Sequence, residues 1–120
     1  MLIVKKFGGS SVANRERIFC VAKRCAEDYK KGNDIVIVLS AMGDTTDDLM
    51  EEAKSINEKA SKREMDMLLA IGEQKSVALM AMALQSLGVP AISLNAFQVM
   101  MHTTSRYGNA RFKNIDIERI

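Results

Sequence analysis

A short apolar run, two consecutive glycines and a helical pattern follow one another at the start of the chain. Residues 2–7 read Leu-Ile-Val-Lys-Lys-Phe, which is typical of a β-strand. Gly8 and Gly9 come next, and they allow a tight turn and a close approach to a ligand because they have no Cβ atom. Lys6 adds a positive charge beside the amide groups of this turn. The order predicts an anion-binding turn between a strand and a helix; a glycine turn without a ligand is the alternative.

The next segments predict a βαβ unit. From Asn14 to Tyr29 the apolar residues recur at helical spacing, and Gly32 follows as a stop signal. Residues 35–39, Ile-Val-Ile-Val-Leu, form the uninterrupted apolar run of a strand in a parallel sheet with helices on both faces. Ligands of such units lie beyond the carboxyl ends of the strands. The glycine turn and residues 40–46 both occupy such ends.

The rest of the chain is predicted to be mainly helical. A capping box at Thr45–Asp48 precedes a helix over residues 47–58, and a second helix covers residues 63–87, in one piece or in two that meet near Gly72. Residues 91–94 predict a short strand, residues 107–112 a hairpin turn with its exit strand, and residues 115–120 an amphipathic helix.

Two polar features allow more than one interpretation. Ser40 and Thr46 either belong to a well-capped helix start or donate hydrogen bonds to a small anionic substrate between their loop and the glycine turn. Glu73 stands among apolar neighbours, where an unpaired carboxylate would be costly. It is therefore either a surface residue or a carboxylate directed at a substrate ammonium group.

No metal site is predicted. The acidic residues at the start of the helix over residues 47–58 are explained by the helix macrodipole, which carboxylates in a first turn stabilise. These residues are Asp44, Asp47, Asp48, Glu51 and Glu52. His102 is the single histidine, expected in a loop, and Cys20 and Cys25 lie five residues apart, which fits neither a redox pair nor a zinc knuckle. We expect both thiols to be reduced.

Composition narrows the classes of partner. The 120 residues are 48% hydrophobic, enough for one compact domain, and the net charge of +2 with 5% aromatic residues gives no sign of a nucleic-acid partner. Only three apolar residues stand between Met1 and the first lysine, which is too few for a signal peptide, and no membrane span is expected. The chain is expected to be cytoplasmic.

Four segments together resemble the aspartokinases of the amino acid kinase family. Neither a P-loop nor a Rossmann fingerprint occurs in the chain. The resemblance lies in residues 6–12 (Lys-Phe-Gly-Gly-Ser-Ser-Val), 40–47 (Ser-Ala-Met-Gly-Asp-Thr-Thr-Asp), 63–74 (Arg-Glu-Met-Asp-Met-Leu-Leu-Ala-Ile-Gly-Glu-Gln) and 108–111 (Gly-Asn-Ala-Arg). They follow the family's order over nearly the whole chain. Related kinases of acetylglutamate, glutamate, carbamate or UMP share the first segment but neither the Ser-Ala-Met-Gly-Asp piece nor the Gly-Glu-Gln piece.

The resemblance implies a fold and a reaction. The fold is α/β, a three-layer α/β/α sandwich with a mainly parallel sheet of the carbamate kinase-like type, here incomplete. The reaction is transfer of the ATP γ-phosphoryl group to the side-chain carboxylate of L-aspartate, the first step toward lysine, threonine and methionine. ATP with Mg²⁺ would be a substrate, and no bound cofactor is required.

The resemblance also assigns site residues. Those implied for the phosphoryl oxygens of ATP are Lys6, Gly8, Gly9 and Ser10, with Lys6 as the catalytic residue. Ser40 and Thr46 would contact aspartate, and Glu73 would pair with its α-ammonium group.

The family's kinase domain is longer than this chain. Residues 1–120 are therefore expected to be the amino-terminal part of one catalytic domain, without the nucleotide-binding half and the ACT regulatory domains, through truncation or proteolysis. Such a piece is expected to be inactive alone and to form a homo-oligomer through exposed apolar surface. The alternative is a natural, non-catalytic module that pairs through residues 77–84 and retains the phosphate-binding loop.

Overall fold

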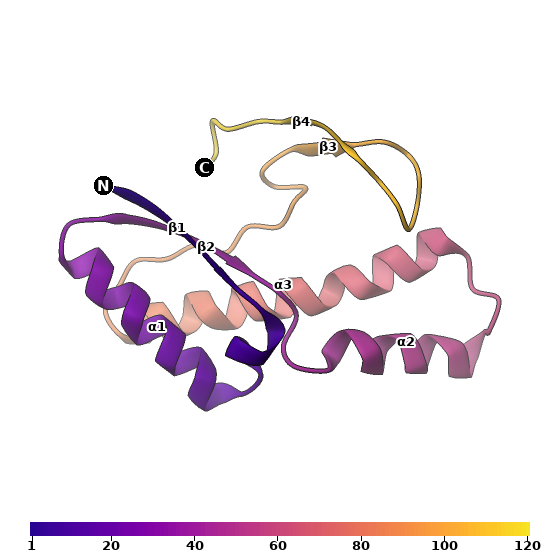
Figure 1. Ribbon diagram of the computed structural model, residues 1–120, viewed down its shortest axis with the longest axis horizontal. Helices are drawn as coiled ribbons and strands as arrows, with labels where there is room; N and C mark the ends of the chain where they lie inside the picture. Colours follow the sequence, from indigo (N-terminus) through magenta and orange to yellow (C-terminus); the bar gives the residue numbers. More distant parts are fainter.

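The computed structural model describes every residue from Met1 to Ile120. Figure 1 shows the order of the elements along the chain. They are β1 (Leu2–Phe7), the 3₁₀ turn η1 (Gly9–Val12), α1 (Arg15–Lys30), β2 (Asp34–Leu39), α2 (Thr45–Ile56), α3 (Lys62–Ser86), β3 (Met101–Thr103) and β4 (Phe112–Ile115).

The predicted βαβ unit is confirmed. β1 and β2 are parallel, in a register that runs from Leu2 opposite Asp34 to Phe7 opposite Leu39. α1 connects them, begins after Asn14, whose side chain accepts a hydrogen bond from the amide of Arg17, and ends before Gly32 with its positive φ of 89°. Both helix signals had been expected from the sequence.

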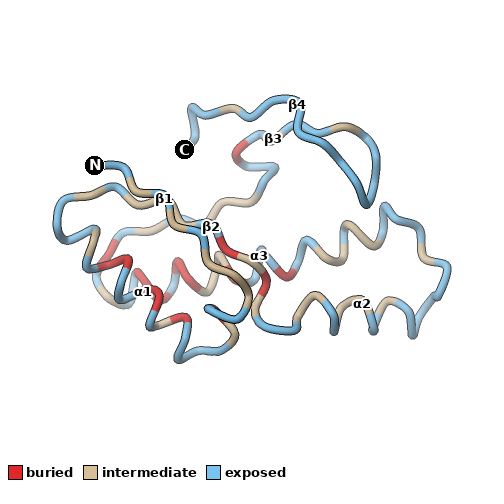
Figure 2. Tube along the Cα trace, in the orientation of Figure 1, coloured by how far each residue is buried: buried red, intermediate tan, exposed pale blue.

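Helices α1 and α3 cover one face of the sheet. The core between them contains Phe7, Ile37 and Leu39 from the strands, and Figure 2 shows its buried residues along α1 and α3. On the opposite face Leu2 and Val4 remain 62% and 63% exposed and Val38 48% exposed. These 120 residues therefore supply one covered and one open face of the β1–β2 sheet.

Helix α2 starts differently from the prediction. It begins at Thr45 with Asp44 as N-cap, and no side chain caps it. The expected capping box is absent because the Thr45 hydroxyl donates to the carbonyl of Met42, 2.6 Å away, in the preceding loop.

Helix α3 is one continuous helix of 25 residues that passes through Gly72 without a break. By length and composition it could also cross a membrane, with a mean hydropathy of 1.4 over 18 residues, so the prediction that no stretch approaches a span is wrong. One third of that window is buried inside the protein, and core helices pass the same test. Its Met80, Ala83 and Leu84 lie in the core with α1.

The last 30 residues depart most from the predictions. Residues 91–94 form no strand, since no other segment pairs with them. The predicted turn and exit strand exist, as β4 pairs antiparallel with β3, and His102 lies on β3 rather than in a loop. Residues 115–120 form no helix, because so short a segment needs tertiary packing to become helical.

Candidate anion-binding site

The glycine turn after β1 is tied down on both sides. Gly8 is extended, with φ −76° and ψ 171°, and precedes η1, where the amide of Ser11 donates to the carbonyl of Gly8 at 3.1 Å. Arg17 Nη1 of α1 donates to the carbonyl of Ser10 at 2.6 Å. Val12, fully buried, anchors the end of η1 in the core. The turn is therefore held in one conformation between β1 and α1.

Three consecutive amide groups of this turn are free. The backbone N–H groups of Gly8, Gly9 and Ser10 donate no hydrogen bond within the protein. Successive free amides form a concave donor surface of the kind that binds anions. An oxyanion at this turn would satisfy these donors.

The turn touches the loop between β2 and α2. The amide of Gly43 donates to the carbonyl of Gly9 at 3.0 Å, and the amide of Ser40 donates to the carbonyl of Phe7 at 3.2 Å. A Cβ atom on Gly9 would lie 2.6 Å from the carbonyl oxygen of Ala41, closer than real Cβ contacts allow. Only glycine permits the two loops to approach so closely.

Helix α3 meets the same loop through Gly72. A Cβ atom on Gly72 would lie 2.9 Å from Cβ of Ala41 and 3.6 Å from Cγ2 of Thr45. Gly9 and Gly72 thus contact Ala41 from two elements, and we call these three residues the glycine joint. It brings three of the four segments of the sequence resemblance together at the carboxyl ends of β1 and β2.

The residues predicted from the sequence belong to the three segments that the glycine joint brings together. Lys6 is exposed on the open face of the sheet, in register with Val38, and Ser10 and Glu73 are also exposed. Ser40 and Thr46 are half-buried, and their hydroxyls make no hydrogen bond, so neither is used as a helix cap. No hydrogen bond or ion pair joins these side chains to one another, and the ion pairs of the protein leave Lys6 and Glu73 free.

Sequence reasoning missed the packing role of Ala41 and Gly72. A glycine inside a helix costs about 1 kcal/mol relative to alanine, so its presence in the middle of α3 was a signal for close packing. The identity of its contact, some 30 residues earlier in the chain, carried no sequence signal.

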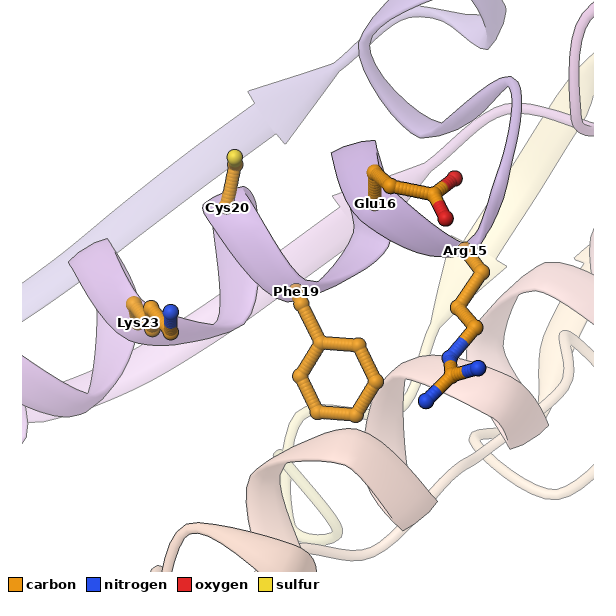
Figure 3. A pocket seen from close by; sticks show the side chains of 5 residues that line it. All are labelled: Arg15, Glu16, Phe19, Cys20 and Lys23. Carbon is orange, nitrogen blue, oxygen red and sulfur yellow. The ribbon is translucent and has the colours of Figure 1, made fainter.

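A surface depression also lies away from this site. It is an open depression along α1, and Figure 3 shows Phe19 and Arg15 on one side of the helix and Cys20 pointing away from them. The Arg15 guanidinium carbon lies 5.9 Å from the centre of the Phe19 ring, within reach of a cation–π contact. A single helix supplies all the side chains that line this depression, which makes it a poor ligand site.

Comparison with known proteins decides the family. A model of the amino acid kinase family matches residues 1–120. The chain belongs to the amino acid kinase family. Its α/β fold agrees with that of the aspartate kinase from Synechocystis, which matches with a TM-score of 0.76 and 52% identity over 78% of this chain and 16% of that chain.

Two relatives in this family are aspartokinases. The aspartokinase of Geobacillus stearothermophilus is 55% identical over 119 residues, which are 99% of this chain and 29% of that protein. Aspartokinase 2 of Bacillus subtilis is 49% identical over 115 residues, 96% of this chain and 28% of that protein. The chain therefore spans less than a third of the length of these amino acid kinases.

Proposed function

We propose that this chain is the amino-terminal part of an aspartokinase catalytic domain, which transfers the γ-phosphoryl group of ATP to the side-chain carboxylate of L-aspartate. The observation that carries this proposal is the glycine joint. It packs the glycine turn, which has the free amides, and α3 against the loop over residues 40–46. The aspartokinase relatives, 49% and 55% identical over almost the whole chain, support the choice of substrate.

Lys6 and the glycine turn would act on the phosphoryl group. Phosphoryl transfer asks a protein chiefly for positioning and for stabilisation of the negative charge on the transferring oxygens. The free amides of Gly8, Gly9 and Ser10 are fixed donors for those oxygens, and Lys6 adds a full charge that no carboxylate of the chain neutralises. Donors held in place before the reaction are the effective kind.

Ser40, Thr46 and Glu73 would hold the acceptor. The hydroxyls of Ser40 and Thr46 make no hydrogen bond within the protein. Both residues belong to the loop that packs on the glycine turn through Ala41 and Gly9. Glu73 follows Gly72 directly on α3, and Gly72 packs on Ala41 of this loop. A carboxylate there would bind the α-ammonium group of aspartate.

The remaining parts of the enzyme belong to the same proposal. Mg²⁺ would enter as part of the MgATP substrate, since in such sites it is bound by substrate phosphates and one or two carboxylates. The nucleotide-binding half and the ACT domains would lie outside these residues, so the 120 residues alone would be inactive. We place the enzyme in the cytoplasm, where ATP is available, as a homo-oligomer.

A chimera tests this function directly. The 119 matched residues of this chain would replace the matching segment of the Geobacillus stearothermophilus aspartokinase, and release of ADP would be measured with L-aspartate as acceptor. We expect aspartate-dependent turnover within about tenfold of the parent enzyme, since a tenfold change corresponds to only about 1.4 kcal/mol of barrier. The parent enzyme is the control for assembly.

The outcomes separate the two classes of function. A chimera that folds and assembles like the parent, yet shows no aspartate-dependent turnover, would contradict the proposal and favour the non-catalytic module. Trapping of the product with hydroxylamine would show that it is an acyl phosphate.

A further inference from the structure

Two lysines are neighbours in β1, and they lie on opposite faces of the sheet. Successive side chains of a strand alternate between the faces. Lys5, in register with Ile37, faces α1, whereas Lys6, in register with Val38, lies on the open face. Only one of the two can stand on the open face beside the glycine turn.

The apolar pattern of β1 only weakly determines which of the two lysines lies on the open face. Leu2, Ile3 and Val4 are all apolar, so a strand moved by one residue would still present apolar side chains to the helices. Such a slip exchanges the faces of all side chains and moves the turn by about 3.3 Å along the strand. The covered face would exchange Ile3 and Phe7 for Leu2 and Val4, so it would still hold two apolar residues and one lysine.

Asp28 on the last turn of α1 holds Lys5. Its Oδ2 accepts a hydrogen bond from Nζ of Lys5, and the two side chains are only 26% and 24% exposed. Its backbone carbonyl accepts a hydrogen bond from Nδ2 of Asn33 at 2.9 Å, which ties this turn to the segment before β2. Lys31 Nζ also lies 3.6 Å from Asp28 Oδ1, but its side chain is 70% exposed.

We propose that Asp28 is a positioning residue for Lys6: by binding Lys5 on the helix-covered face, it fixes β1 so that Lys6 stands on the open face beside Gly8 and Gly9. The functional consequence rests on the proposed phosphate-binding role of Lys6; the structural one does not. The hydrogen bond from Lys5 lowers the pKa of the Asp28 carboxyl, so the carboxylate remains charged at neutral pH.

Amine acetylation of this chain tests the structural part. Limited treatment with sulfo-N-hydroxysuccinimide acetate, followed by fragment-ion mass spectrometry, gives the rates at Lys5 and Lys6 separately. We expect Lys6 to react about tenfold faster than Lys5, because a charge-assisted hydrogen bond holds the Lys5 amine. In Asp28→Asn the two rates should approach each other. Lys31→Ala, which removes the exposed partner of the same carboxylate, should keep the wild-type ratio.

Two further variants separate positioning from general stability. Asp28→Glu should restore the ratio. The exchange Lys5→Glu with Asp28→Lys keeps an ion pair at this point with the charges reversed, and it leaves the rate at Lys6 as the quantity to measure. In the exchange variant Lys6 should react at its wild-type rate. A folded exchange variant with a slow Lys6, or an Asp28→Asn variant with an unchanged ratio, would overturn the proposal.

The same variants in the chimera test the consequence for the reaction. We expect Asp28→Asn to raise the KM for MgATP and lower kcat about tenfold. This is less than the roughly 10²-fold cost of removing an oriented donor, because the displaced lysine keeps its charge. Lys31→Ala should leave both constants unchanged. An inactive chimera would refute the proposed function while the acetylation ratio still decides the role of Asp28. Unchanged kinetics in an active Asp28→Asn chimera would refute the link to Lys6.

Discussion

At the scale of single residues, the most distinctive feature of the candidate site is the unpaired positive charge of Lys6. It stands at the end of β1 without a carboxylate partner, while its neighbour Lys5 is held by Asp28. Neither the Lys6 ammonium group nor the three free amides of the turn make an interaction that stabilises the fold. We propose that Lys6 binds a ligand with negative charge.

Lys6→Ala in the chimera should therefore lose at least about 10²-fold in kcat, because removal of one oriented donor to a transition-state oxyanion costs that much. Lys113→Ala, an exposed lysine on β4, is the control and should behave as the unmodified chimera. Steady-state assays of ADP release measure both. Near-normal turnover in Lys6→Ala would remove Lys6 from the site.

The two cysteines should differ in reactivity. Cys20 is exposed, whereas Cys25 is buried in the core, where desolvation raises the pKa of its thiol. A thiol must ionise to react, so at pH 8 a disulfide reagent should modify Cys20 quickly and Cys25 only upon unfolding. Counting modified thiols against time, with Cys20→Ser as control, tests this. Rapid modification of two thiols in the folded chain would contradict the core position of Cys25.

The pair of Asp28 with Lys5 should make stability depend on pH. The pKa of Asp28 is lowered in the folded chain, so its contribution is present above the ordinary carboxyl pKa of about 4 and is lost as the pH falls through the lowered value. Asp28→Asn should therefore be less stable than the wild type at pH 7, with a difference that shrinks below about pH 4. Urea unfolding at several pH values measures this. A difference that stays constant with pH would count against the ion pair.

At the scale of elements, the glycine joint decides how β1, the β2–α2 loop and α3 meet. Local patterns predicted the strands over residues 2–7 and 35–39 and the helix after Asn14, because each element shows its own period and its own end signals. They could not predict that the Thr45 hydroxyl would bond Met42 instead of capping α2. Nor could they show that Gly72 packs on Ala41, because that contact joins distant segments.

Alanine substitutions at the two adjacent glycines of the turn should differ in their effect on stability: one should destabilise the chain and the other should be nearly neutral. Gly9→Ala places a methyl group 2.6 Å from the carbonyl oxygen of Ala41 and should cost about 1–3 kcal/mol of unfolding free energy. Gly8→Ala meets nothing within 4 Å, at a φ of −76° that alanine adopts easily, and should stay within about 0.5 kcal/mol. Denaturant unfolding compares the two. Equal effects would contradict the close contact of the loops.

Gly72→Ala should destabilise the chain, although replacing glycine by alanine inside a helix usually stabilises a protein. Alanine inside a helix normally stabilises by about 0.5–1 kcal/mol relative to glycine. Here its methyl group would lie 2.9 Å from Cβ of Ala41, so we expect a loss of about 1–3 kcal/mol. Gln74→Ala, at an exposed position of the same helix, is the control and should be nearly neutral. A stabilised Gly72→Ala variant would contradict the close packing of α3 on the loop at Ala41.

At the scale of the whole molecule, the chain is more open than its length suggests. Its radius of gyration is 15.9 Å, against about 14 Å expected of a compact domain of this length. Only 16 of 120 residues are buried, and the open face of the sheet exposes Leu2, Val4 and Val38. Exposed apolar surface of this kind promotes association.

We therefore expect a dimer or a larger oligomer at micromolar concentration. Replacing Val4 and Val38 on the open face with threonine should shift the population toward monomer, because the apolar area available for contact falls. Light scattering coupled to size exclusion measures both. A monodisperse monomer of the unmodified chain would contradict this expectation.

We propose that the free amides of the glycine turn and Lys6 form an anion site within these 120 residues. Titration of the ¹⁵N-labelled chain with MgATP, followed by amide NMR spectra, tests it most directly because such spectra detect millimolar binding. We predict saturable shifts of the Gly8, Gly9 and Ser10 amides that Lys6→Ala abolishes. Amide signals that do not shift at saturating nucleotide, or shifts that persist unchanged in Lys6→Ala, would contradict an anion site formed by this turn and Lys6.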